Sequence, residues 1–330
     1  MKNLEKLGEI LDRFKDVKIM VIGDVMIDRY VRGSVNRMSP EAPVPVLDHQ
    51  HSENRLGGAA NVALNLDGLG AVVSLISVIG DDQEGRTFCR LLDDQGLSST
   101  GIILSEDRIT TVKTRLMAED QHLLRVDKER ADALSEDLEY KLLTEIKSTI
   151  LKQKISAVLF QDYDKGILSE RINKKIIDFA IEHNVQTYVD PKFNNFFSYQ
   201  NTTLFKPNLV ELRAKVPFDV EINEHDLARA TKYIRNRLGC NDVLVTLSGD
   251  GIFFDHLGQT SWVPVVDCEI SDVCGAGDTV ISMVALGHQV GLRGWDLAYL
   301  ACRAGTIVCQ YPGVQPISRE ILWGAFVNVG

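Results

Sequence analysis

Several patterns that assign many proteins to a class are missing from this sequence. The six cysteines of the 330-residue chain show no C-x-x-C spacing, and a chain of this length does not need disulfides for stability. We therefore expect reduced thiols and a cytoplasmic location. An excess of positive charge is missing as well. Because 36 Lys and Arg stand against 46 Asp and Glu, the net charge of −10 argues against a nucleic-acid-binding protein.

Long apolar segments are also absent. No stretch approaches the roughly 18 uncharged apolar residues that a membrane helix requires, and residues 1–16 alternate charged residues with Leu and Ile, unlike a secretory signal. We expect no membrane partner. The sequence has no Gly/Ser-rich linker and no internal repeat, which predicts a single domain over residues 1–330.

What the sequence does contain is an alternation of short apolar runs and helical patterns. The first run, residues 18–23, ends in Gly-Asp and is typical of a buried strand whose loop opens at its carboxyl end. Such alternation predicts an α/β fold with a mainly parallel sheet covered by helices on both faces. The predicted strands are residues 18–23, 72–79, 157–160, 186–189, 203–205 and 243–247, and the predicted helices are residues 59–69, 84–95, 136–151, 170–183 and 225–238.

Two segments, residues 29–52 and 109–127, interrupt this alternation. The first contains Pro40, Pro43 and Pro45, and the second reads as two strands joined by a polar turn at Glu119-Asp120. Neither has a helix to cover it, so we expect both to form a small antiparallel sheet that stands off the main body. The natural use of such a sheet is a lid over an active site.

The lid also bears on the oligomeric state. A small sheet with exposed edges and apolar residues such as Val44, Val46 and Leu47 tends to pair with another chain. A second copy of the same chain is the simplest partner. We therefore expect a homodimer joined through the lids.

The strongest local signal is D-V-C-G-A-G-D at residues 272–278, which an apolar helical run follows directly. Small residues at a helix start leave backbone N–H groups exposed, and the helix dipole adds positive charge, so we expect Gly275, Ala276 and Gly277 to form an anion hole. Asp278 beside it would stay ionised and accept a proton from a substrate hydroxyl. The alternative is that Asp278 only stabilises the first turn of the helix.

Two common nucleotide motifs are excluded. A P-loop needs the dipeptide Gly-Lys, which occurs nowhere in the chain. A dinucleotide fingerprint that begins at Gly275 would need glycine at position 280, which is Val280. A phosphate site in this protein must use another scaffold.

Two weaker patterns lie before other helices. Gly57 and Gly58 let the backbone approach a ligand closely, and Asn61 can donate to and accept from hydroxyls, although a glycine pair is equally often only a turn. Asn208 and Glu211 fall on one face of a helix, where their oxygens suit Mg²⁺ held mainly through water. A capping box explains the same two residues equally well.

Charged and histidine residues of the predicted lid give less specific signals. His49 and His51 lack further clustered ligands, which favours solvated positions over a metal pair. Lys113, Arg115 and Arg125 alternate along the lid strands, where they would either meet an anionic substrate or form the solvated face of the sheet.

Four motifs stand in the order and approximate spacing of one known family. They are G-G-A-A-N at residues 57–61, K-P-N-L-V-E at 206–211, T-L-S-G-D-G at 246–251 and D-V-C-G-A-G-D at 272–278. Together they resemble the ribokinase-like, PfkB-type carbohydrate kinases, over the chain from Lys18 to about Glu320. The resemblance implies a three-layer α/β/α fold with a mainly parallel central sheet and a small β-sheet lid.

The lid and several loops resemble one branch of that family. The segments are G-D-V-M-I-D-R-Y at residues 23–30, N-R-M-S-P-E-A-P-V-P-V at 36–46, D-Y-D-K-G at 162–166 and D-P-K at 190–192. They are similar to the D-glycero-β-D-manno-heptose 7-phosphate kinases, which also share Val273 where most of the wider family has Thr. Phe193 departs from that branch, which commonly has Gly there. The H-x-G-H motif of the nucleotidyltransferase domain that often accompanies the branch is missing, so we expect the stand-alone kinase or a truncated chain.

This resemblance implies transfer of the γ-phosphate of ATP to the anomeric hydroxyl of heptose 7-phosphate. The product would be the 1,7-bisphosphate, on the route to ADP-heptose for the lipopolysaccharide core. Asp278 would be the base, with the amides of Gly275, Ala276 and Gly277 as anion hole and Mg²⁺ as cofactor. Many relatives also use a monovalent cation such as K⁺ beside the anion hole. These groups supply the positioning and charge stabilisation that phosphoryl transfer needs.

The remaining site residues are carried over by the same resemblance. The sugar phosphate would be bound by Asp28, Arg37, Gly57, Gly58, Asn61, Lys113, Arg115, Arg125, Asp162, Lys165 and Lys192. The nucleotide would be bound by Asn208, Glu211, Thr246, Ser248, Gly249 and Gly251, and Asn208 and Glu211 would also hold Mg²⁺ through water. Two alternatives stay open: a kinase of this family for another sugar, sugar phosphate or nucleoside, and a non-catalytic sensor of sugar phosphates.

Overall fold

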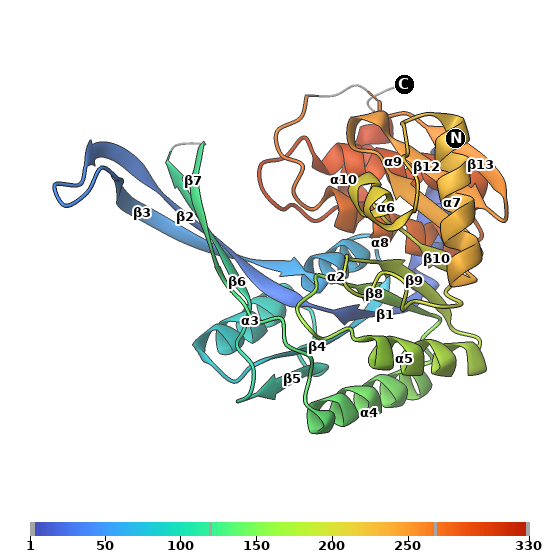
Figure 1. Cartoon of the computed structure of the whole chain (residues 1–330), viewed down its shortest axis with the longest axis horizontal. Coiled ribbons are helices and arrows are strands. Elements are labelled where there is room, and N and C mark those ends of the chain that lie inside the picture. Colours follow the sequence, from blue (N-terminus) through green and yellow to red (C-terminus); the bar gives the residue numbers. More distant parts are fainter. Residues whose placement is uncertain (1–3, 119–120, 267–268, 328–330) are drawn as a thin grey trace.

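The computed structural model describes residues 4–118, 121–266 and 269–327, so the polar turn predicted at Glu119-Asp120 lies outside the described residues. Within this part of the chain there is a nine-stranded sheet with helices on both faces and a four-stranded sheet beside it (Figure 1). The predicted α/β fold, a three-layer α/β/α body with a mainly parallel sheet and a small β-sheet lid, is confirmed.

The large sheet forms the body of the molecule. Its strands in the described residues are β1 (Lys18–Gly23), β4 (Val72–Gly80), β5 (Ile102–Ser105), β8 (Ala157–Gln161), β9 (Gln186–Asp190), β10 (Leu204–Phe205), β11 (Asp242–Thr246), β12 (Ile252–His256) and β13 (Gln259–Val263). Their order across the sheet is β13-β12-β11-β10-β9-β8-β1-β4-β5. Neighbouring strands are parallel from β5 to β11, and β12 and β13 add an antiparallel edge.

Alternate residues of the central strands enter two separate hydrophobic cores. Ile19 and Val21 of β1 face one core, whereas Met20 and Ile22 face the other, because successive side chains of a strand point to opposite faces. All four side chains are fully buried. The sheet therefore needs helices on both sides, which is why its strands read as continuous apolar runs in the sequence.

The helices divide between these two cores. The first core is covered by α1 (Leu4–Arg13), α2 (Ala59–Gly68), α3 (Gln83–Asp94), α8 (Ala276–Gln289), α9 (Gly294–Val308) and α10 (Arg319–Val327). The second is covered by α4 (Glu136–Gln153), α5 (Glu170–Glu182), α6 (Leu209–Lys215) and α7 (Glu224–Leu238). No helix of the described residues is long and apolar enough to cross a membrane.

The small sheet is the predicted lid. Its strands are β2 (Val25–Met38), β3 (Pro45–Gly58), β6 (Val112–Ala118) and β7 (Gln121–Lys128), in the order β3-β2-β6-β7. The hairpins β2-β3 and β6-β7 are antiparallel, whereas β2 and β6 pair in parallel. β2 continues β1 and β6 follows β5, so both strands start from the same edge of the large sheet and run in the same direction. The strands extend beyond the predicted segments, residues 29–52 and 109–127. That a single domain spans residues 1–330 stays a prediction.

Some helices and strands were not predicted, because their sequences lack the usual patterns. Helix α9 is buried on nearly every side, so it lacks the apolar stripe of a surface helix. Strands β12 and β13 form a hairpin around Leu257 and Gly258, which both have positive φ. Leu-Gly is not one of the usual dipeptides of such a turn, which are Asn-Gly and Asp-Gly.

Candidate active site

Helix α8 begins directly before the predicted base. Its capping residue Gly275 has φ of 82°, in the left-handed region that glycine enters without strain. A Cβ at Gly275 would lie 3.2 Å from Nδ2 of Asn61, so the loop passes close to that side chain. The unpartnered N–H groups and positive dipole of a helix start agree with the predicted anion hole. The amide of Ala276 is partly engaged, since it donates to the carbonyl of Val273 at 3.3 Å.

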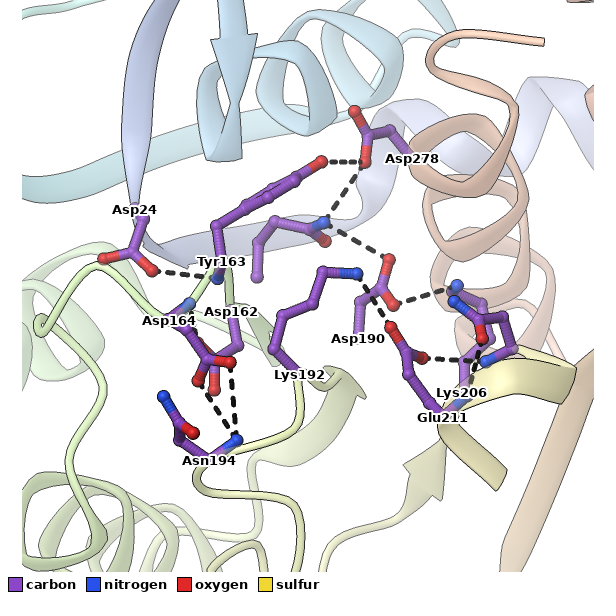
Figure 2. Close-up of polar contacts among 12 residues, drawn as sticks. Asp24, Asp162, Tyr163, Asp164, Asp190, Lys192, Asn194, Lys206, Glu211 and Asp278 are labelled. Carbon is purple, nitrogen blue, oxygen red and sulfur yellow. Dashed lines mark hydrogen bonds and ion pairs between the residues drawn. The ribbon is translucent and has the colours of Figure 1, made fainter. Parts of the chain in front are cut away.

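Asp278 lies in the first turn of α8 and is only 7% exposed. Asn61 of α2 donates to its Oδ2 at 2.7 Å, and Gln161 at the end of β8 donates to its Oδ1 at 3.1 Å. The hydroxyl of Tyr163, in the loop after β8, donates to Oδ1 at 2.8 Å (Figure 2). The alternative that Asp278 only stabilises a helix start does not account for donors from these separate segments.

The surroundings of Asp278 set its proton affinity. Burial raises the pKa of this carboxyl to about 6. The hydrogen bonds from Asn61 and Tyr163 and the charge of Lys206 lower the pKa, whereas the charge of Asp190 raises it. At neutral pH the group is therefore an ionised carboxylate with the raised proton affinity that suits a general base.

A chain of polar contacts continues from Asp278 into the protein (Figure 2). Nε2 of Gln161 also donates to Oδ2 of Asp190 at 3.2 Å, and Nζ of Lys206 lies 2.9 Å from Oδ1 of Asp190. The ammonium group of Lys206 is buried and lies 3.9 Å from the position of a Cβ built on Gly277. A buried positive charge thus stands next to the predicted anion hole.

Glu211 is 1% exposed, and the protein engages both of its carboxylate oxygens. Lys192 Nζ lies 2.8 Å from Oε1, and the amide of Asn208 donates to Oε2 at 2.9 Å. Asn208 Oδ1 accepts from the amide of Glu211 at 2.8 Å, which completes a capping box at the start of α6, as the alternative interpretation predicted. A metal ion would therefore be reached through water, as Mg²⁺ commonly is. In the described part of the chain, no three His, Cys, Asp or Glu side chains are grouped as a metal site.

The predicted nucleotide residues lie at the end of β11. Thr246 pairs with Asn208 in a parallel bridge, so the structure brings these two predicted residues together. Ser248 and Gly249 lie in the short 3-10 helix η2 (Ser248–Asp250) and are exposed, and Gly251 follows it with φ of 89°. The tight turn therefore presents main-chain groups at the surface beside the start of α6.

The glycine pair at the end of β3 packs against Asp28 of β2 and against Asp24, which directly precedes β2. A Cβ on Gly57 would lie 2.1 Å from Oδ2 of Asp28, and one on Gly58, whose φ is 61°, would lie 2.3 Å from the carbonyl oxygen of Asp24. Asp28 forms an ion pair with Arg115 of β6, and both side chains are mostly buried. Only glycine lets the end of β3 lie so close to Asp24 and Asp28. This close packing places Asp28 beside the start of α2.

Three of the predicted cationic residues gather around the loop after β8. The ammonium groups of Lys113 and Lys192 lie 5.7 and 5.4 Å from the centroid of the Tyr163 ring. Lys165 is on the same loop, and its ammonium lies 2.8 Å from Glu129. Burial lowers the pKa of Lys113, and the neighbouring charge of Lys165 lowers it further.

The structure does not bring Arg37, Arg125 or Asp162 to Asp278. Arg37 is exposed near the far end of β2, where the hairpin stands away from the body (Figure 1). Arg125 is exposed on β7 and pairs with Asp127 of its own strand at 2.9 Å. Asp162 is buried and accepts from the hydroxyl of Tyr199 at 2.6 Å. Burial, with the nearby charge of Asp24, raises the pKa of Asp162 to about 7.

Four residues of the site were not predicted: Gln161, Tyr163, Asp190 and Lys206. Each stands at, or within two residues of, the carboxyl end of β8, β9 or β10. Ligands of parallel α/β sheets bind beyond the carboxyl ends of the strands, so the strand ends themselves were the signal that could have found these residues.

Comparison with known proteins identifies the family of this chain. The model of the pfkB family carbohydrate kinases matches residues 16–321. The bifunctional protein HldE of Helicobacter pylori is 39% identical over 304 residues, which cover 92% of this chain and 65% of that protein. The bifunctional protein HldE of Paramagnetospirillum magneticum is 38% identical over 309 residues, which cover 93% of this chain and 63% of that protein. The chain spans slightly less than two thirds of the length of these relatives.

Solved structures share the fold. Phosphofructokinase-2 from Escherichia coli in complex with potassium matches with a TM-score of 0.79 at 18% identity, over 95% of this chain and 99% of that chain. Arabidopsis thaliana ribokinase complexed with ribose and ATP matches with a TM-score of 0.72 at 17% identity, over 94% of this chain and 98% of that chain. At these identities the likeness shows the fold alone.

If Asp278 is the general base, we expect turnover to depend on pH. The base works only as a carboxylate, so kcat should be level above neutral pH and fall about tenfold per unit below a pH of about 6. A pH profile of kcat measures this limb. Asp162→Asn is the control, because the buried carboxyl of Asp162 also has a raised pKa. If the fall in kcat at low pH disappeared in that variant, the assignment to Asp278 would be wrong.

A second prediction concerns Gly57. Gly57→Ala should displace the carboxylate of Asp28, because the added Cβ would lie 2.1 Å from Oδ2. We expect the KM for the acceptor to rise at least about tenfold, with a smaller change in kcat. Gly324→Ala is the control, since among the described residues nothing lies within 4 Å of a Cβ built at that position. An unchanged KM in Gly57→Ala would remove Asp28 from acceptor binding.

Proposed function

The chain belongs to the pfkB family of carbohydrate kinases and is thus an ATP-dependent sugar kinase, and on this premise we propose that its acceptor is D-glycero-β-D-manno-heptose 7-phosphate. The product is the 1,7-bisphosphate, on the route to ADP-heptose for the lipopolysaccharide core. The observation that carries the reaction type is the buried carboxylate of Asp278 at the start of α8, next to the predicted anion hole. The acceptor rests on the lid segment at residues 36–46 and on the similarity to the bifunctional proteins HldE.

In the proposed reaction, Asp278 takes the proton of the anomeric hydroxyl group. The oxygen forms a bond to the γ-phosphorus of ATP, the bond between that phosphorus and the bridging oxygen breaks, and ADP leaves. The amides of Gly275, Ala276 and Gly277 and the ammonium group of Lys206 stabilise the charge of the moving phosphoryl group. The partly engaged amide of Ala276 contributes least to this stabilisation.

Clustered positive charge supports a phosphate subsite for the acceptor. Lys113, Lys165 and Lys192 lie around Tyr163, and burial and the charge of Lys165 lower the pKa of Lys113. Lys165 and Lys192 also pair with Glu129 and Glu211. We assign the 7-phosphate to these three lysines. Arg115 is neutralised by Asp28 and instead holds that carboxylate toward the sugar hydroxyls, together with Gly57, Gly58 and Asn61. Arg37, Arg125 and Asp162 have no part in this subsite within a single chain.

The nucleotide would bind between the start of α6 and the turn at residues 246–251. Mg²⁺ would be held through water by Glu211 and Asn208, whose oxygens are of the kind that this ion prefers, and it would neutralise charge on the ATP phosphates. A monovalent cation belongs to the proposal as well, since one structural neighbour was solved in complex with potassium. The carboxylate of Asp272 links the loop before α8 to Gly313 at 3.1 Å and offers oxygen beside the anion hole.

Another pfkB-type acceptor, such as a different sugar phosphate or a nucleoside, is the second candidate. The four motifs fit it equally well, but the lid segment does not favour it. A non-catalytic sensor is the weakest candidate, because it gives no role to the buried carboxylate of Asp278 at the glycine-capped start of α8. A cytoplasmic location, where ATP is available, completes the proposal.

We include a homodimer joined through the lids. Every residue of the edge strand β7 is exposed, and its Leu124 and Val126 are 58% and 51% exposed. An edge strand with exposed apolar residues favours pairing, and a second lid supplies the same strand in return.

Asp278→Asn tests the base. We expect kcat to fall at least about a hundredfold, the usual scale for a positioned base, while ATP still binds. Asp296→Asn is the matched control, because Asp296 occupies the same position in the first turn of α9. An unchanged kcat in Asp278→Asn would remove Asp278 from the mechanism.

A coupled ADP-release assay against a panel of sugars, sugar phosphates and nucleosides tests the acceptor. We expect the heptose 7-phosphate to give the highest kcat/KM. Turnover of ribose or fructose 6-phosphate, with none of the heptose phosphate, would establish the second candidate in place of the first.

Light scattering tests the assembly. We expect a dimer that Leu124→Lys converts to a monomer, because a charge would be buried at the joined edges. Leu151→Lys is the control, since Leu151 of α4 is also 55% exposed but lies on the body. A wild-type monomer at working concentration would refute the lid dimer.

A further inference from the structure

Tyr163 contacts the proposed base, although no sequence motif assigned it a role. Its hydroxyl group donates to Oδ1 of Asp278 at 2.8 Å, and Gln161 donates to the same oxygen at 3.1 Å (Figure 2). Within the described residues, the other oxygen, Oδ2, accepts a single hydrogen bond, from Asn61 at 2.7 Å. Each carboxylate oxygen has about two lone-pair directions. Oδ1 is therefore filled by the protein, and Oδ2 keeps one direction open.

We propose that Tyr163 is a positioning residue for the base: it holds Oδ1 of Asp278 so that Oδ2 receives the proton of the sugar hydroxyl. The inference rests on the proposed function, because it takes Asp278 as the base. Tyr163 itself exchanges no proton with the acceptor. It orients the carboxylate and sets the pH above which the carboxylate can work.

The loop that carries Tyr163 is held rigidly by Asp24. The Asp24 carboxylate is 1% exposed and accepts main-chain hydrogen bonds from Tyr163 at 2.8 Å, Lys165 at 3.1 Å and Ile167 at 3.4 Å. Asp164, which has φ of 56°, is tied to the next loop, because it accepts from the amide of Asn194 at 3.3 Å. The phenol is thus already in place before a substrate binds, and no ordering of the loop is needed at the moment of reaction.

The phenol is also a permanent donor. Burial raises the pKa of Tyr163 well above 10, and the charges of Asp278 and Asp190 act in the same direction. The hydroxyl group therefore keeps its proton at every working pH. The ammonium groups of Lys113 and Lys192 lie over the ring and leave the hydroxyl group free to donate to the carboxylate.

The hydrogen bond from Tyr163 opposes the effects of burial and of Asp190 on the pKa of Asp278. The charged groups that face Asp278 are Asp190 of β9, Lys206 after β10 and, with a smaller effect, Lys192. Burial and Asp190 favour the protonated form of Asp278, whereas Tyr163, Asn61 and Lys206 favour the carboxylate. Loss of one donor to a charged acceptor must shift the balance toward the protonated form.

Tyr163→Phe tests the proposal, because it removes the hydroxyl group and keeps the ring. A hydrogen bond to a charged group corresponds to a shift of about one pH unit or more. We expect the acid limb of the kcat profile to move up from a pH of about 6 by about one unit. The variant should then be about fivefold slower than wild type at pH 6 and approach tenfold slower at lower pH, and the difference should shrink above pH 8. Tyr188→Phe is the matched control, since Tyr188 is a buried phenol that bonds to His288 at 2.8 Å instead of to Asp278.

A second measurement does not depend on turnover. The carboxyl ¹³C resonance of Asp278, assigned by its absence in Asp278→Asn, should titrate about one unit higher in Tyr163→Phe than in wild type. In the wild type, the phenol ¹³Cζ resonance of Tyr163 should titrate with the same midpoint as Asp278. An acid limb and a carboxyl midpoint that stay in place in Tyr163→Phe would overturn the inference. A shifted carboxyl midpoint in a protein that phosphorylates no acceptor would support the inference and refute the proposed function.

Discussion

The structure depends on one constraint: a carboxylate must stay ionised after it has been taken out of water. Asp278 satisfies this constraint with hydrogen-bond donors from α2, from the end of β8 and from the loop that follows it. These segments meet only because parallel strands deliver their carboxyl ends to the same edge of the sheet. The glycine at the start of α8 brings the helix close enough to Asn61 for contact. The fold is thus the means by which a buried charge is tolerated.

The overall charge of the protein conceals the electrostatics of this edge. The chain carries a net charge of −10, yet Lys206, Lys192 and the positive start of α8 all lie at this edge of the sheet. Both lysines are paired with carboxylates, Asp190 and Glu211. Such pairing compensates part of the cost of burying the lysine side chains.

The sequence was sufficient to predict most strands and helices of the body and the residues at the centre of the site. Continuous apolar runs located the central strands because both of their faces are buried, and the glycines at residues 275–277 located the helix that carries Asp278. The sequence was insufficient to predict residues whose role depends on the order of the strands in the sheet. Gln161, Asp190 and Lys206 meet only when β8, β9 and β10 lie side by side, and no local pattern records that. Likewise, alternation along a strand could not show that Arg125 lies on an outer edge whereas Lys113 faces Tyr163.

The attachment of the lid to the body determines how the lid can move. Asp24 is the only residue between β1 and β2, and its amide, its carbonyl and its carboxylate are all bonded, to Gln161, Ala59 and the loop at residues 163–167. A strand clamped in this way has no hinge at its root. Any movement of β2 relative to the body must therefore be spread along the strand as bending, so the stiffness of the small sheet sets the energy that such a movement requires.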